Sequence, residues 1–239
     1  MIGLALAGVL LQVNPCRDQA APFVAAAVER GESFDLAGAA WTFFVASGQW
    51  CVDAEIAGHY LRGLVAAREA YKQGGSPESL VPVTLAVAAI DARAALAPAL
   101  AATARAVLLA AAAAAQSERD EMALLLEHAI RLETLQLEAG QPTLSVATAH
   151  EVAGDLWLQV HRYDDAQRAY QEALARIGRT PRVSLGLARA HARLKDTSSA
   201  CTQYRRLLAW WDTRRNEPAE IAEARAFVAQ PACAAPSNQ

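Results

Sequence analysis

The second half of this amino-acid sequence repeats itself at an interval of 34 residues. Three residue pairs share the interval: Ala166 with Ala200, Tyr170 with Tyr204, and Leu174 with Leu208. A period of this length is typical of helical hairpins that stack in a row, because a single hairpin cannot bury its own apolar face. The interval therefore predicts an α-helical solenoid, a fold that presents a long curved surface to other chains.

The repeating region divides into two units, 147–180 and 181–214. In the first unit, small and aromatic residues mark two helices with a turn at 161–163 between them. The second unit begins at Pro181, and proline suits the first turn of a helix. Its own turn is predicted at 195–197, one period after the first turn. Small residues recur where two helices would have to cross closely.

The placement of these residues resembles the tetratricopeptide repeat family, whose unit is a pair of antiparallel helices with small and aromatic residues at fixed positions. The first unit matches that pattern at Gly154, Trp157, Tyr163, Ala166, Tyr170 and Ala173. The second unit keeps Ala188, Ala200 and Tyr204, but departs from it at His191, Thr197 and Leu207. The resemblance implies a right-handed superhelix of hairpins. An ordinary helical bundle, with chance matches at this interval, is the alternative.

A capping helix is predicted after the second unit, at 219–228. It follows Pro218 and alternates polar residues such as Glu223 with apolar residues such as Ile221. The last unit of a stack needs one polar face, because nothing packs beyond it. The region 147–230 is therefore interpreted as two repeats and their cap.

The region 17–140 is predicted to contain divergent helical hairpins. The whole chain has only ten prolines and thirteen glycines, between long segments of Ala, Leu, Glu and Arg, which favours an all-α fold. A helix is expected at 52–73, a break at 74–77, and another helix at 118–138. The alanine-rich stretch 83–115 is interrupted by Asp91, Arg93, Pro98 and Arg105, which argue against a membrane span, and Pro98 predicts two helices or one kinked helix.

The segment 1–16 carries no charged residue and has the length of a secretory signal core, although it lacks a positive start. We expect an exported bacterial protein, periplasmic or secreted. The alternative is that 1–16 forms a buried apolar helix, in which case the protein would be cytoplasmic. The apolar run is too short to cross a bilayer, for which about 20 residues are needed.

Four cysteines occur, namely Cys16, Cys51, Cys201 and Cys233, and they permit three complete pairings. A disulfide between Cys201 and Cys233 would fasten the capping helix to the second unit. A disulfide between Cys16 and Cys51 would fasten the amino-terminal helices. Such bonds agree with export to an oxidising compartment, but cysteines in helices are also often buried as free thiols.

No enzymatic motif is found. His150-Glu151 begins like a zinc-protease helix, but Gly154 stands where the second histidine should be. The other histidines are scattered without metal-ligand spacing, and the sequence has no phosphate-binding loop, dinucleotide fingerprint or nucleophile elbow. The net charge of −3 disfavours general attraction to nucleic acid. We therefore expect neither catalysis nor a metal or cofactor.

The resemblance implies that the first helix of each hairpin lines a concave binding face. The exposed positions expected there are Glu151, Asp155, Arg182, Arg189 and Arg193. They would form an acidic patch beside a basic one, and the acidic residues would repel the carboxyl terminus of a partner. The alternative is that these residues pair with one another across the hairpins.

The leading functional hypothesis is a non-enzymatic scaffold that binds a protein or peptide on its concave face. One alternative is a protein that associates with itself or holds an envelope assembly together. Another is an enzyme whose site lies within 20–140 and whose repeats recruit the substrate.

Overall fold

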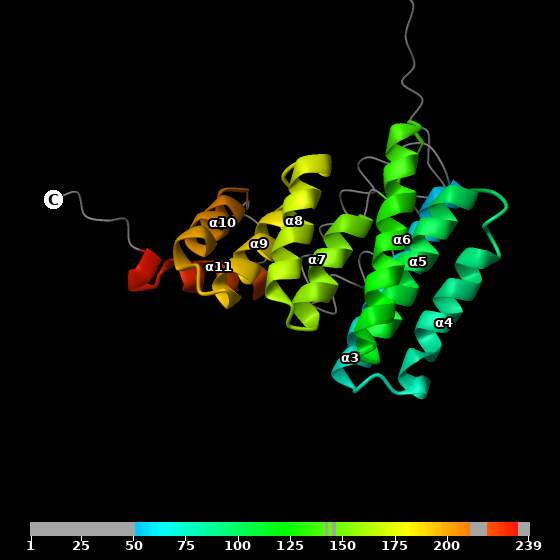
Figure 1. The fold of residues 1–239 in the computed structure, drawn as a ribbon, viewed down its shortest axis with the longest axis horizontal. Coiled ribbons are helices and arrows are strands. Elements are labelled where there is room, and N and C mark those ends of the chain that lie inside the picture. Colours follow the sequence, from blue (N-terminus) through cyan, green and yellow to red (C-terminus); the bar gives the residue numbers. More distant parts are fainter. Residues whose placement is uncertain (1–50, 142, 145–146, 211–218, 234–239) are drawn as a thin grey trace, which may run out of the picture.

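The computed structural model describes residues 51–141, 143–144, 147–210 and 219–233. This part of the chain has an all-α fold. Nine α-helices and one short 3-10 helix are found there (Figure 1). Their bounds are α3 Cys51–Lys72, α4 Pro77–Asp91, α5 Pro98–Ala115, α6 Arg119–Glu138, α7 Ala149–Gln159, α8 Tyr163–Ile177, α9 Pro181–Arg193, α10 Thr197–Trp210, α11 Ala219–Val228 and η1 Pro231–Cys233.

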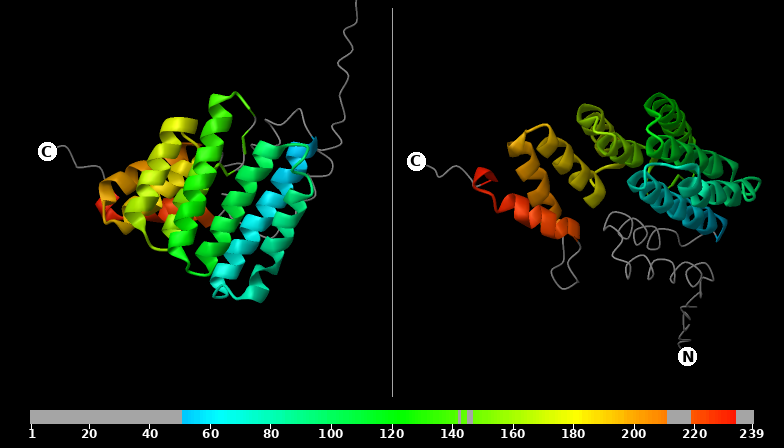
Figure 2. Two further views of the ribbon diagram at one scale, coloured as in Figure 1. Left: turned by 45° about the vertical axis from the view of Figure 1, so that its right-hand side comes forward. Right: turned by 90° about the horizontal axis from the view of Figure 1, so that it is seen from below.

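The helices pack as sequential antiparallel pairs, as the predicted hairpins require. Helix α3 pairs with α4, α5 with α6, α7 with α8, and α9 with α10, while α11 packs against α10 (Figures 1 and 2). Further contacts join the pairs: α3 packs on α5, and α8 on α9. Residues 1–50 lie outside the described residues, and with them the predicted signal segment 1–16 and Cys16. The link 211–218 lies outside them as well.

Glycine and proline set the helix boundaries in the first half. Helix α3 ends because Gly74 and Gly75 take positive φ angles of 84° and 68°, and the Gly75 amide donates to the Ala70 carbonyl at 2.8 Å. Helix α4 starts directly after the Ser76 cap, with Pro77 in its first turn. Pro98 likewise opens α5, so the alanine-rich stretch forms two separate helices rather than a single kinked one.

Helix α5 is the centre of the first half, where it packs against α3, α4, α6 and α7. Helices α5 and α3 approach each other closely at Gly63 of α3. A Cβ atom added to Gly63 would lie only 2.6 Å from the Leu108 side chain of α5. Among the described helices, α5 alone has the length and apolar composition of a membrane span. In this structure, however, 67% of that segment is buried against protein, as in the core helix of a bundle.

The two 34-residue units end their first helices in the same way. His161 after α7 and Lys195 after α9 both have φ of 63°, and they lie one period apart. In each case the next residue donates its amide to a carbonyl five residues back: Arg162 to Trp157, and Asp196 to His191. This hydrogen bond closes the helix end and turns the chain toward the second helix. Both turns lie at the predicted positions.

Tyr170 of α8 fills the space between α7 and α9. Its ring is fully buried. A Cβ atom on Gly154 of α7 would lie 2.6 Å from this ring, and one on Gly186 of α9 would lie 2.1 Å from it. Both glycines are therefore needed for the ring to fit between the two helices. The sequence pattern singled out Gly154 but not Gly186, which is out of phase with it by two residues.

The carboxy-terminal helix α11 is fastened by packing and by a covalent bond. Ile221 and Ala224 are buried, and the Phe227 ring lies 4.8 Å from that of Tyr204. Cys201 of α10 forms a disulfide with Cys233, and Arg205 donates a hydrogen bond to the Cys233 carbonyl. This disulfide is the expected link between cap and second unit. The Cys16–Cys51 pairing lies outside the described side chains and stays a prediction.

We predict that Gly186→Ala destabilises the protein by about 1–3 kcal/mol, because the added methyl group overlaps the Tyr170 ring. The matched control is Gly58→Ala in α3, where an added Cβ meets nothing within 4 Å. That substitution should stabilise the helix by about 0.5–1 kcal/mol. Urea unfolding monitored by circular dichroism measures both. Equal effects would show that Tyr170 does not limit the space at Gly186.

We also predict that the double substitution Cys201→Ala and Cys233→Ala lowers the free energy of unfolding by about 2–4 kcal/mol, since the bond closes a loop with a sequence separation of 32. Thermal unfolding of the native protein and the variant should differ under oxidising conditions. With dithiothreitol present, the two proteins should unfold at nearly the same temperature. A gap that persists in reductant would show that side-chain packing, not the bond, causes it.

Candidate binding groove

An open groove of about 600 Å³ lies between the first and second halves of the structure. Its walls come mainly from α3, α7 and α9, and Tyr204 of α10 and Glu223 of α11 extend one end. Four of the five predicted concave-face residues line it: Asp155, Arg182, Arg189 and Arg193. The fifth, Glu151, does not appear among its described lining residues.

Glu151 is buried, and its carboxylate accepts a hydrogen bond from the backbone at the start of α7. Its carboxylate accepts from the Thr148 amide at 3.1 Å, while its own amide donates to the Thr148 hydroxyl at 3.2 Å. This reciprocal arrangement caps the start of α7. The other carboxylate oxygen accepts from the Thr180 hydroxyl at 2.8 Å, and Thr180 caps α9. Glu151 therefore ties the starts of two helices together.

Asp155 and Arg182 pair with each other across the hairpins, which was the alternative interpretation of these residues. Arg182 of α9 donates to one carboxylate oxygen of Asp155, and the Tyr170 hydroxyl of α8 donates to the other. Arg182 is buried. One carboxylate thus joins three consecutive helices, α7, α8 and α9. Sequence reasoning placed Tyr170 by its ring and missed the contribution of its hydroxyl.

A second group, again made of a carboxylate, an arginine and a tyrosine, lies toward the other end of α9. Arg189 donates to both carboxylate oxygens of Glu223 of α11, with Nη2 to Oε2 at 2.6 Å and Nε to Oε1 at 3.1 Å and to Oε2 at 3.2 Å. The Tyr204 hydroxyl of α10 donates to Glu223 Oε1 at 2.6 Å. Tyr204 lies 34 residues after Tyr170, so the repeat places both tyrosines beside a carboxylate that also binds an arginine of α9.

The electrostatics of this second group follow from its contacts. Burial by itself raises the pKa of Glu223, but the hydrogen bonds and charge of Arg189 outweigh it, so that the pKa lies below its usual value. Burial, followed by the hydrogen bond to Glu223, raises the pKa of the Tyr204 hydroxyl well above its usual value. The carboxylate is therefore charged and the hydroxyl keeps its proton near neutral pH.

Arg193 differs from the other four residues because it is exposed and lies one turn beyond Arg189. Across the groove, α3 contributes Arg68 and Lys72 to the wall. Lys72 also donates to Glu69 at 2.6 Å, a pair exposed to solvent. The described lining thus carries five cationic side chains against two carboxylates, and both carboxylates are bound by arginine. No acidic patch is presented by Asp155 and Glu151.

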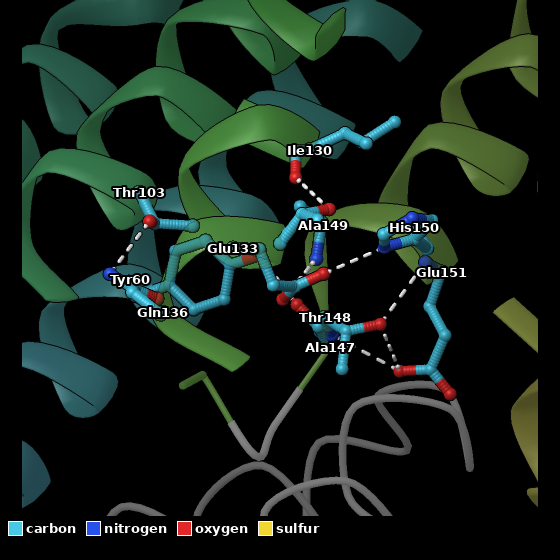
Figure 3. Close-up of polar contacts among 11 residues, drawn as sticks. Tyr60, Thr103, Ile130, Glu133, Gln136, Ala147, Thr148, Ala149, His150 and Glu151 are labelled. Carbon is cyan, nitrogen blue, oxygen red and sulfur yellow. Dashed lines mark hydrogen bonds and ion pairs between the residues drawn. The ribbon is translucent and has the colours of Figure 1, made fainter. Parts of the chain in front are cut away.

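A separate buried polar cluster joins α6 to the start of α7 (Figure 3). His150 Nδ1 lies 2.8 Å from Glu133 Oε2, and the Ala149 amide donates to Glu133 Oε1 at 2.9 Å. Glu133 and His150 each expose only 1% of their side chains. Glu133 thereby accepts a hydrogen bond from the first turn of α7, where backbone amides have no partner within the helix. The sequence did not predict Glu133 as a partner of His150.

Two further hydrogen bonds near this cluster join neighbouring segments of the fold. The Tyr60 hydroxyl of α3 donates to the Ala147 carbonyl at 2.7 Å, which holds the chain just before α7. Gln136 of α6 donates to Thr103 of α5 at 3.1 Å. Glu133 binds Nδ1 of His150, one of the two ring nitrogens through which a histidine can bind a metal ion. Within the part of the chain that the structure describes, no group of three or more His, Cys, Asp or Glu side chains could hold a metal ion.

Comparison with protein-family models, with curated proteins and with solved structures finds no match to this chain. The resemblance to tetratricopeptide repeats therefore rests on the residues of the two 34-residue units.

We predict that Glu223 stabilises the fold in a pH-dependent way. Its pKa is lower in the folded than in the unfolded chain, where a glutamate has a pKa of about 4.3. The stabilisation is therefore complete above that value and is lost as the pH falls through the lower folded pKa. The stability gap between native protein and Glu223→Gln should accordingly shrink as the pH drops from about 6 to about 3.

Urea unfolding at several pH values measures this gap. Glu138→Gln is the control, because Glu138 is exposed at the end of α6. Its substitution should produce no comparable pH-dependent gap. A gap for Glu223→Gln that stays constant through this range would mean that the charge on Glu223 contributes nothing to folding.

Proposed function

We propose that this chain is a non-enzymatic scaffold of the tetratricopeptide-repeat type, in which the groove between α3, α7 and α9 binds a segment of a partner protein. The observation that carries the proposal is the groove itself, which gathers four of the five residues assigned from the repeat pattern. Two units with the same period and the same helix-ending turn at His161 and Lys195 support the repeat assignment.

The groove is suited to binding because its walls are held in place before any partner arrives. Asp155, Arg182 and Tyr170 fix α7, α8 and α9, and Arg189, Glu223 and Tyr204 fix α9, α10 and α11. A preorganised surface loses less conformational entropy on association. These contacts mean that Glu151, Asp155, Arg182 and Arg189 support the groove, whereas Arg193 is the assigned residue left to meet a partner.

The charge of the lining favours an acidic partner segment. Lys72 on α3 and Arg193 on α9 extend from opposite walls, and the two groove carboxylates are already bound by Arg182 and Arg189. Complementary charge increases the association rate and excludes basic competitors. The exposed Lys72–Glu69 pair is weak enough to be exchanged for a partner carboxylate.

Export to an oxidising compartment is part of this proposal. The Cys201–Cys233 disulfide supports it, since such bonds persist mainly outside the cytosol. The alternative of an enzyme with its site within 20–140 gains no support from Glu133 and His150, because solvent and substrate do not reach this buried pair. The alternative of self-association is favoured by a different surface, the exposed apolar face of α4.

We predict that the double substitution Lys72→Glu and Arg193→Glu weakens binding of the groove partner, because both changes place acidic groups where an acidic segment would lie. Affinity capture with mass spectrometry identifies the partner of the native chain, and calorimetry then compares affinities. The loss should exceed about tenfold and should shrink at high salt.

The matched control reverses two exposed arginines outside the described groove lining, with Arg131→Glu on α6 and Arg176→Glu on α8. It has the same change in net charge and should bind the partner like the native chain. If both double variants lose the partner equally, net charge alone explains binding; if both keep it, the partner binds elsewhere. Either result contradicts the groove assignment.

A further inference from the structure

The outer face of α4 carries apolar side chains that no other described part of the chain covers. Val81 is 52% exposed and Leu85 64%, and Ala88 and Ala92 continue the same side of the helix on exposed positions. We call these four residues the α4 stripe. Beyond it, Leu96 in the following turn is 71% exposed. Three of the six large hydrophobic residues found exposed in the described chain therefore lie in this one short segment.

Helix α4 is apolar on its inner face too. Leu80, Val83, Val87 and Ile90 are buried, and the helix packs against α3 and α5. No charged residue occurs between Glu78 and Asp91. A helix that is apolar all round is normally buried on every side. Yet α4 lies at the edge of the bundle, where its outer face meets solvent (Figure 1). The second apolar face therefore requires a partner.

The spacing of the α4 stripe fits another helix. Its residues follow one another at intervals of four, three and four, the spacing that pairs helices side by side. Around a twofold axis between Leu85 and Ala88, Leu85 of one copy would pack against Ala88 of the other. A large residue would thus meet a small one at both central contacts, which lets two helices approach closely. The stripe is complementary to itself in this antiparallel arrangement.

The charges at the ends of α4 favour the same arrangement. Glu78 is exposed near the start of the helix, and Arg93, which binds Glu55, lies just after its end. In the same register, Glu78 of one copy faces Ala95 of the other, two residues from Arg93, so the opposite charges lie at the same end of the interface. Between these ends the stripe offers no charge to an acidic or basic partner. It also has no lysine or arginine that could reach the head groups of an anionic membrane.

We propose that the α4 stripe is the surface through which two copies of this chain associate, antiparallel and related by a twofold axis. This surface is separate from the groove, since no residue of α4 is among the described groove lining. The proposal stands whether or not the groove binds a partner. It assigns self-association to the first half of the chain rather than to the two repeats.

Sedimentation equilibrium on the full chain tests this proposal, at concentrations from about 1 μM to about 1 mM, where a weak dimer becomes populated. The native chain should show a mass that rises to that of a dimer. Leu85→Glu should raise the dissociation constant more than about tenfold, because it places two like charges in the apolar interface. The control Leu124→Glu changes an equally exposed leucine on α6, 69% exposed, and should leave the dimer intact.

An equimolar mixture of Leu85→Glu and Leu85→Lys adds a second criterion. The two positions 85 lie close together across the proposed axis, so the opposite charges should restore a dimer that neither variant forms alone. Circular dichroism should show that all variants fold, since Leu85 is largely exposed. A monomeric native chain, a dimer unaffected by Leu85→Glu, a dimer broken equally by Leu124→Glu, or a mixture that stays monomeric would each overturn the proposal.

Discussion

The second half of the structure depends on Tyr170, whose ring and hydroxyl hold three helices at once. The ring fits only because Gly154 and Gly186 have no side chains, and the hydroxyl binds Asp155, which Arg182 also binds. A buried charge pair gains little by itself, because both groups lose their water, and further hydrogen bonds are needed to compensate. Tyr170 supplies such a bond. The same residue therefore sets the spacing of α7 and α9 and supports the charge pair that joins them.

Helix α9 is held by charge pairs near both of its ends. Arg182 near its start is bound by the Asp155 group, and Arg189 near its end is bound by the Glu223 group. The two groups repeat one design: a tyrosine hydroxyl and an arginine of α9 share one carboxylate. Arg193 projects from the helix that both groups hold. The position of Arg193 in the groove wall is thus determined by contacts at two distant points.

Much of the fold was predictable, because it follows from local signals. The 34-residue interval placed α7 to α10, and glycine and proline placed the end of α3 and the start of α5. The side-chain partners were not predictable in this way. Asp155 lies 27 residues from Arg182, and Glu133 lies 17 residues from His150, so neither pair follows the period or a helical spacing. The groove charge was also misjudged, since it depends on which carboxylates are already bound, and a sequence does not show that.

The disulfide at the end of the chain has a consequence for how the molecule opens. Among the described helices, α11 packs mainly against α10, so few contacts oppose its fraying. Here α11 supplies Glu223, which holds Arg189 in the groove wall, and fraying would release that wall. The Cys201–Cys233 bond prevents the end from peeling away independently. The rate at which a protease cleaves this region then depends on the unfolding of α10 and α11 together, and not on the fraying of α11 alone.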